Sequence, residues 1–151
     1  MTTPSKAVPA AAADLKPAPQ LCVLVVEDNE ADAYLIRRAL FDQPDVGLVF
    51  IAQDGVEALR MVEDGEVTPD LAFIDLKMPR KDGFGLLADL ADREDASFPK
   101  VVLTSSNAPV DAMRSRMRGA LRVFSKPDTY AALQARVHRE VRRAMSSALS
   151  Q

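Results

Sequence analysis

Four short apolar runs in this sequence each end in residues that can bind a metal ion or a phosphate. The first run ends in Glu27 and Asp28, and a later one ends in Asp75. The last two end in Thr104 and Lys126. Continuous apolar runs of this length are typical of buried parallel strands, and ligands bind at the carboxyl ends of such strands. We therefore expect these five side chains to converge on one edge of a sheet.

The residue types at this edge indicate phosphoryl chemistry assisted by a cation. Three carboxylates close together repel one another and stay ionised most easily around a divalent cation. Oxygen ligands favour Mg²⁺, and the single Cys22 and single His138 offer no set of soft ligands. Lys126 and Thr104 can hold phosphoryl oxygens, and a carboxylate can act as the nucleophile to give an aspartyl-phosphate. The pattern predicts Mg²⁺-dependent phosphorylation of a carboxylate.

Each of these residues also has a purely structural explanation. Asp28 or the neighbouring Asn29 could cap a helix, and Asp75 could start a turn. Thr104 could be a cap, and Lys126 could be a surface residue. The ordered combination at successive strand ends favours the functional interpretation.

The rest of the pattern supplies the elements that would position these side chains. Apolar runs alternate with helical patterns five times, which predicts an α/β fold with a parallel sheet covered by helices on both faces. We expect Asp54 to begin the second helix and Asp128 the last, with Asn107, Pro109 and Gly119 as cap, first-turn proline and terminal glycine of the fourth. The expected strands are Leu21–Val26, Leu48–Ile51, Leu71–Ile74, Val101–Leu103 and Val123–Phe124.

Composition limits the domain organisation and the compartment. Residues 1–20 are rich in Ala and Pro and nearly free of large apolar side chains, which predicts a disordered tail before a domain over 21–149. No output domain is expected after it. The sequence has no apolar run long enough for a bilayer and no signal peptide, and one cysteine cannot form an internal disulfide. We expect a cytoplasmic protein that does not bind a membrane.

Charge is distributed unevenly along the chain. The net charge is −3, yet residues 109–151 contain nine Lys/Arg and only three Asp/Glu. This excess predicts a basic C-terminal face, which is either a solvated helical surface or a surface for an acidic partner. Nucleic acid is not an expected partner, because no aromatic residues accompany the arginines and no recognition motif is present.

The same residues resemble the receiver domains of bacterial two-component response regulators. The matching segments cover residues 21 to about 145 and are VLVVEDNEADAYLIRRAL, DGVEALRMV, PDLAFIDLKMPRKDGFGLL, VVLTSSN and GALRVFSKP. The resemblance implies a flavodoxin-like, doubly wound (βα)5 fold with strand order 2-1-3-4-5. A weaker likeness, through the EDN opening, RRAL, DLKMPRKDG and LTSS, is to stand-alone receivers that partner bacterial phytochromes.

The resemblance also implies a role for each site residue. Asp75 would be the phosphoacceptor, and Asp28 and Asp75 would bind Mg²⁺ together with the backbone carbonyl of Lys77. Glu27 would act on the metal through water. Thr104 and Lys126 would hold phosphoryl oxygens, and the peptide bond after Lys126 would be cis.

One position departs from the family pattern. An aromatic residue usually lies three positions before the lysine, where this chain has Val123, followed by Phe124. Adjacent side chains of a strand point to opposite faces, so Phe124 does not replace it. We hypothesise that the usual coupling between the threonine and an aromatic side chain is altered.

The resemblance implies a signalling switch that catalyses only its own phosphorylation and dephosphorylation. Its partners would be a sensor histidine kinase, with a phytochrome-type kinase as one candidate, and a downstream protein. Contacts or homodimerisation would use the face of the fourth helix, fifth strand and last helix. The alternatives are a phosphorylation-independent binding module and a phosphate sink that competes for the kinase. P-loop nucleotide hydrolases are excluded by the missing GxxxxGK[ST] motif.

Overall fold

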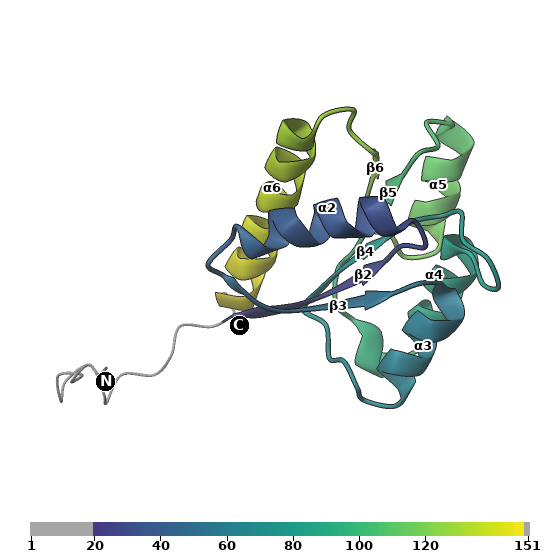
Figure 1. Cartoon of the computed structure of the whole chain (residues 1–151). Helices are drawn as coiled ribbons and strands as arrows, with labels where there is room; N and C mark the ends of the chain where they lie inside the picture. Colours follow the sequence, from purple (N-terminus) through teal and green to yellow (C-terminus); the bar gives the residue numbers. More distant parts are fainter. Residues whose placement is uncertain (1–19, 150–151) are drawn as a thin grey trace, which may run out of the picture.

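A computed structural model describes residues 20–149, and these form one α/β domain built on a parallel sheet. The sheet has the order β3-β2-β4-β5-β6, which is 2-1-3-4-5 when the strands are counted along the chain (Figure 1). The predicted fold class and strand order are confirmed. The strands are β2 Leu21–Val26, β3 Val46–Ala52, β4 Leu71–Ile74, β5 Lys100–Thr104 and β6 Arg122–Ser125.

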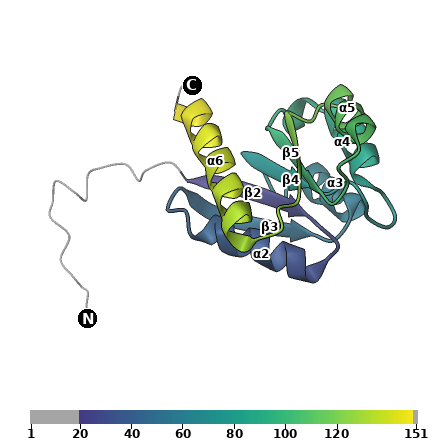
Figure 2. The same ribbon diagram turned by 90° about the horizontal axis from the view of Figure 1, so that it is seen from above.

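Helices cover both faces of this sheet. They are α2 Glu30–Phe41, α3 Gly55–Glu63, α4 Gly83–Ala91, α5 Pro109–Met117 and α6 Tyr130–Leu149, with a short 3₁₀ turn η1 at Glu94–Ala96. Figure 2 shows α2 and α6 on one face and α3, α4 and α5 on the other. Alternate residues of β2 face the two layers: Val23 and Val25 pack with α2 and α6, and Leu24 and Val26 pack with α3 and α4.

Side-chain caps fix the start of three helices. Asn29, Asp54 and Asp82 each accept a hydrogen bond from the backbone N–H three residues later. The expected cap Asp54 is confirmed, and between Asp28 and Asn29 the structure selects Asn29. Because Asn29 caps α2, Asp28 at the end of β2 does not act as a helix cap.

Two predicted helix starts are wrong. Helix α5 begins at Pro109, so the cap position falls on Ala108 and not on the expected Asn107. Alanine has no side chain that can cap a helix. The last helix begins at Tyr130, where Thr129 Oγ1 accepts a hydrogen bond from Ala132 N, so Thr129 takes the role expected of Asp128. Gly119 follows α5 with a φ of 105°, as expected of a residue that ends a helix.

The expectation of a cis bond before Pro127 is also wrong. Residues 20–149 contain no cis peptide bond. The trans form is the default even before proline, by about 0.5–1 kcal/mol, so the backbone here follows the more common geometry.

The remaining expectations concern the ends of the chain and membranes. Residues 1–19 of the expected tail lie outside the described residues, and the proposed division at residue 20 stays a prediction. Within residues 20–149, no helix combines the length and apolar character needed to cross a bilayer.

Candidate functional site

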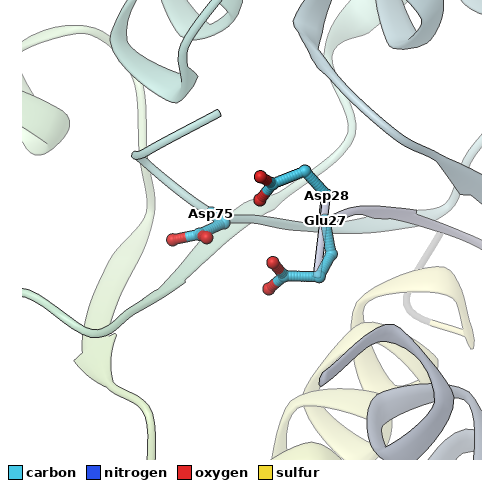
Figure 3. Close-up of side chains that lie close together, drawn as sticks. All are labelled: Glu27, Asp28 and Asp75. Carbon is cyan, nitrogen blue, oxygen red and sulfur yellow. The ribbon is translucent and has the colours of Figure 1, made fainter. Parts of the chain in front are cut away.

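Three carboxylates meet at the carboxyl edge of the sheet. Glu27 and Asp28 follow β2, and Asp75 follows the neighbouring strand β4 (Figure 3). One carboxylate oxygen from each residue lies within 4.8 Å of those of the other two. Asp28 is exposed, whereas Glu27 and Asp75 are buried. The convergence expected from the sequence therefore holds for these three residues.

Backbone hydrogen bonds of the sheet continue past the strands and place these groups. Asp75 N donates to Val26 O at 3.0 Å, and Glu27 N donates to Ala52 O at 2.9 Å. Each strand end is thus fixed to its neighbour. The Asp75 carboxylate is oriented further, because Leu76 N donates to its Oδ1 at 2.8 Å. The cluster therefore stands on rigid sheet backbone.

Lys126 brings a positive charge to this cluster from the end of β6. Its Nζ lies 2.7 Å from Glu27 Oε1, 2.8 Å from Asp32 Oδ2 and 3.4 Å from Asp75 Oδ2. Its backbone is held by β5, because Lys126 N donates to Thr104 O at 2.7 Å. One ammonium group therefore balances part of the charge of three carboxylates.

The electrostatics of the site follow from burial and from these contacts. Burial has the largest effect on Glu27, the hydrogen bond from Lys126 opposes it, and the nearby Asp75 adds to it, so that the pKa of Glu27 is raised to about 7. For Lys126, burial disfavours the charged form, but the pairs with Asp32, Glu27 and Asp75 outweigh it and raise its pKa. The site thus keeps its lysine charged and holds a carboxylate that a further cation would stabilise in the ionised form.

The donor set fits a hard divalent cation. Glu27 Oε1 is buried, and Lys126 Nζ lies 2.7 Å from it. Three carboxylates share this one ammonium group, so a divalent cation or its water shell would compensate the remaining negative charge. All three clustered side chains offer oxygen ligands, which suit Mg²⁺ or Mn²⁺.

Thr104 and Lys77 lie at the same edge of the sheet. Thr104 ends β5 with its side chain buried, and its Oγ1 accepts a hydrogen bond from Ser106 N at 3.2 Å. Lys77 has an exposed side chain. No hydrogen bond to its carbonyl oxygen occurs in the described part of the chain. Both positions are compatible with their expected roles, which remain predictions.

Val123 and Phe124, where this chain departs from the family pattern, face opposite sides of the sheet, as expected. Val123 packs with the layer of α3 and α4, and Phe124 packs with the layer of α2 and α6. Val123 and Thr104 line the same cavity of about 80 Å³, beneath the loop before α5. The guanidinium of Arg136 lies 3.7 Å from the centroid of the Phe124 ring, so Phe124 is held against α6.

Two contacts of functional interest escaped the sequence analysis. Asp32 lies in the first turn of α2 and pairs with Lys126, 94 residues away. The acidic run from Glu27 to Asp32 was the available signal, because a first-turn acid faces the same sheet edge as the residues before its helix. Glu140 of α6 is fully buried and accepts hydrogen bonds from Arg122 at 2.7 Å and Arg143 at 3.0 Å. The sequence offered no comparable signal for Glu140.

Comparison with known proteins decides the family. The sequence profile of the family described as "Response regulator receiver domain" matches residues 23–138, which is more than half of the chain. This chain belongs to the response regulator receiver family. The receiver domains of this family are phosphorylated by histidine kinases in two-component systems.

Individual relatives agree with this assignment. The receiver is 35% identical over 111 residues to protein-glutamate methylesterase/protein-glutamine glutaminase 5 of Myxococcus xanthus (strain DK1622), covering 72% of this chain and 31% of that enzyme. It thus spans about a third of that enzyme. It is 31% identical over 103 residues to response regulator Rcp1 of Synechocystis sp. (strain ATCC 27184 / PCC 6803 / Kazusa), covering 64% of this chain and 70% of Rcp1.

Solved structures with the same fold include two crystal structures of response regulators. The phosphorylated cyanobacterial phytochrome response regulator RcpA matches with a TM-score of 0.79 at 28% identity, over 85% of this chain and 96% of that chain. The Mn²⁺-bound form of a response regulator named Rcp1 matches with a TM-score of 0.73 at 27% identity, over 79% and 90% of the two chains. The receiver fold therefore extends over most of the described residues.

Proposed function

We propose that this receiver domain is a Mg²⁺-dependent switch in which Asp75 accepts a phosphoryl group from a sensor histidine kinase. The observation that carries the proposal is the convergence of Asp28, Glu27, Asp75 and Lys126 at the carboxyl edge of the sheet. The family supports it, and so does the phosphorylated state in which the similar protein RcpA was crystallised.

The chemistry needs a nucleophile and compensation for the transferred charge. A carboxylate oxygen of Asp75 forms a bond to phosphorus while the bond between phosphorus and the kinase's histidine nitrogen breaks, and the imidazole leaves. Lys126 Nζ, 3.4 Å from Asp75 Oδ2, is placed to bind a phosphoryl oxygen. Thr104 would donate its hydroxyl to another oxygen. Catalysis of this kind depends on positioning and electrostatics.

The residues that would hold the metal are Asp28 and Asp75, with the Lys77 carbonyl and with Glu27 through water. Bound Mg²⁺ supplies positive charge that offsets the charge of the phosphoryl oxygens and of the carboxylates. The acidic cluster and the Mn²⁺-bound state of the similar Rcp1 support a divalent ion here.

Intact mass after incubation with acetyl phosphate tests the proposal. Wild type should gain one phosphoryl group with Mg²⁺ and none with EDTA, and Asp75→Asn should gain none. Asp92→Asn is the matched control, because Asp92 is exposed at the far end of α4, and it should behave as wild type.

Two results would contradict the proposal. Equal labelling of Asp75→Asn and wild type would place the phosphoryl group elsewhere. No labelling of wild type, together with no binding of beryllofluoride in the presence of Mg²⁺, would favour a binding module that works without phosphorylation.

The likeness to RcpA supports a phytochrome-type histidine kinase as the phosphodonor.

The downstream surface we propose is the face of α5, β6 and α6, used for a partner protein or a second copy of the chain. Val110, Met113 and Met117 are exposed on α5 at the spacing of one helical stripe, and Leu121 is exposed just before β6. An exposed apolar stripe of this kind favours contact with another protein.

A further inference from the structure

The loop between β4 and α4, residues 75–82, runs beside the acidic cluster and is held at both of its ends. Gly83 N donates to Leu76 O at 2.9 Å, which closes the loop where α4 begins. A Cβ at Gly83 would lie only 2.3 Å from Asp75 O, so the close approach of these two segments requires glycine. Residues in the middle of the loop are held by hydrogen bonds to another element.

These hydrogen bonds join the loop to the start of α3, at Asp54 and Gly55. Gly55 N donates to Lys81 O at 2.9 Å, and a Cβ at Gly55 would lie 2.5 Å from that oxygen. Arg80 Nε donates to Asp54 Oδ2 at 2.7 Å, and Arg80 Nη2 donates to Asp54 Oδ1 at 3.1 Å. The loop is therefore fastened to the neighbouring helix by one backbone bond and one two-point ion pair.

Arg80 makes this pair from an unfavourable backbone conformation. Its φ is 64°, and among residues 20–149 it is the one non-glycine residue with a positive φ. Such a conformation persists in a residue with a Cβ only when its surroundings hold it. Asp54 is buried and also caps α3 through Glu57 N, so its carboxylate is a fixed anchor.

Lys77 lies between the cluster and this anchor, two residues after Asp75 and three before Arg80. On its C-terminal side, Met78 packs against the core beneath α3 and α4. Mg²⁺ requires nearly ideal octahedral geometry, so a backbone carbonyl can serve as a ligand only where its segment is held still.

We propose that Arg80 is a positioning residue, which through its two-point pair with Asp54 fixes the β4–α4 loop so that the Lys77 carbonyl can bind the divalent cation. The proposal rests on the metal site of the proposed function. Groups that orient metal ligands without touching the metal commonly change affinity by 10- to 100-fold. The exposed side chain of Arg80 places its effect at the low end.

Binding of Mn²⁺, followed by the electron paramagnetic resonance signal of the free ion, tests this role. Arg80→Gly deletes the guanidinium and adopts the positive φ without strain. We expect its Mn²⁺ dissociation constant to rise about 10-fold, with at most a small loss of urea midpoint, because relief of the positive φ offsets part of the lost ion pair. A residue with a merely structural role would lower the midpoint and leave the dissociation constant unchanged, and that result would overturn the proposal.

Asp54→Asn removes the other half of the pair and keeps an equally good helix cap. It should weaken Mn²⁺ binding as much as Arg80→Gly does, and the double variant should be no weaker than either single variant, because both remove one interaction. Arg60→Ala is the matched control. It breaks exposed ion pairs on α3 to Asp64 and Glu66, away from the loop, and should bind Mn²⁺ as wild type does.

Asp28→Asn separates this proposal from the proposed metal site. If Asp28→Asn binds Mn²⁺ as tightly as wild type, the metal site itself is wrong. If Asp28→Asn weakens binding while Arg80→Gly and Asp54→Asn do not, the site stands and the positioning role of Arg80 is rejected.

Discussion

Lys126 places one ammonium group against the carboxylates of Glu27, Asp32 and Asp75. Two of these carboxylates are buried, and the side chain of Lys126 itself is only 18% exposed. The pairing therefore holds together charges that water cannot reach well, and removing the lysine would leave buried anions without compensation.

Lys126→Met should reduce the free energy of unfolding by about 2–4 kcal/mol in EDTA, because breaking a buried pair from one side strands the remaining charge. Saturating Mg²⁺ should recover a large part of this loss, since a cation in the cluster replaces the missing charge. Urea unfolding with EDTA and with Mg²⁺ measures both values. An equal loss in the two conditions would show that the cation does not reach these carboxylates.

Lys81→Met is the control for this experiment. Lys81 pairs with Asp89 near the surface, and such exposed pairs contribute about 0–1 kcal/mol. Lys81→Met should therefore reduce the free energy of unfolding only slightly, and by the same amount with and without Mg²⁺.

The start of α4 sets the closest approach between two elements at the site. A Cβ at Gly83 would meet backbone atoms of Asp75 and Leu76, which cannot move without shifting the proposed phosphoacceptor. A Cβ at Gly85, two residues later, would meet only side-chain atoms, the nearest in the flexible Lys81 at 3.2 Å and the next Asp82 Oδ1 at 3.5 Å. The two glycines thus offer a matched comparison within one helical turn.

Gly83→Ala should destabilise the protein by about 2–4 kcal/mol, in the range of overpacked core substitutions, and should reduce labelling by acetyl phosphate. Gly85→Ala should be neutral or stabilising by up to about 1 kcal/mol, because alanine favours the helix. Urea midpoints and the extent of phosphorylation check both variants. Equal stabilities of Gly83→Ala and wild type would mean that the close approach at Gly83 is not required.

Helix α6 is joined to β6 by a buried carboxylate that the sequence analysis did not predict. The side chain of Glu140 is 0% exposed and lies among Arg122, Arg143 and, at 4.0 Å, Arg136. Some arginines of the expected basic face therefore make contacts within the molecule. Arg114 and Arg136, for example, lie over the rings of Phe84 and Phe124.

Glu140→Gln should cost about 1–3 kcal/mol in the free energy of unfolding, because the two guanidinium groups lose their shared anion while remaining partly accessible to water. Arg139→Gln, on the exposed side of the same helix, should change stability by less than about 0.5 kcal/mol. Thermal and urea unfolding measure these differences. Similar values for the two variants would show that the buried pair adds no stability.

At the scale of the whole molecule, the acidic edge and the exposed stripe of α5 are separate surfaces. The acidic cluster lies at the ends of β2 and β4, and Val110, Met113 and Met117 lie on the outside of α5. Met117 is 80% exposed. A switch in which phosphorylation at one surface controls contacts at the other fits this arrangement, whether the partner is another protein or a second copy.

We predict that beryllofluoride with Mg²⁺ promotes dimerisation through the face of α5, β6 and α6. Sedimentation should show a larger mass for the treated wild type than for the untreated protein. Met117→Glu should keep the monomer mass after treatment, because it places a charge in the contact. Leu48→Glu, at another exposed apolar position, on β3, should still dimerise. The same mass for treated and untreated wild type would count against the dimer.

The sequence by itself determined the alternation of strands and helices, the α/β class and the residues of the acidic cluster. It could do so because hydrophobic periodicity reports local structure and because parallel strands bring their carboxyl ends to one edge. The position of Asp75 and Lys126 at the ends of apolar runs was therefore enough to predict that they lie together.

Only the tertiary structure decided the contacts between residues far apart in the chain. The pairs Lys126–Asp32, Arg80–Asp54 and Arg122–Glu140 depend on how far long side chains reach across packed elements, which no local pattern encodes. The trans bond before Pro127 and the cap at Thr129 depend likewise on small energy differences. Local periodicity fixes the elements, and packing selects which charged groups meet between them.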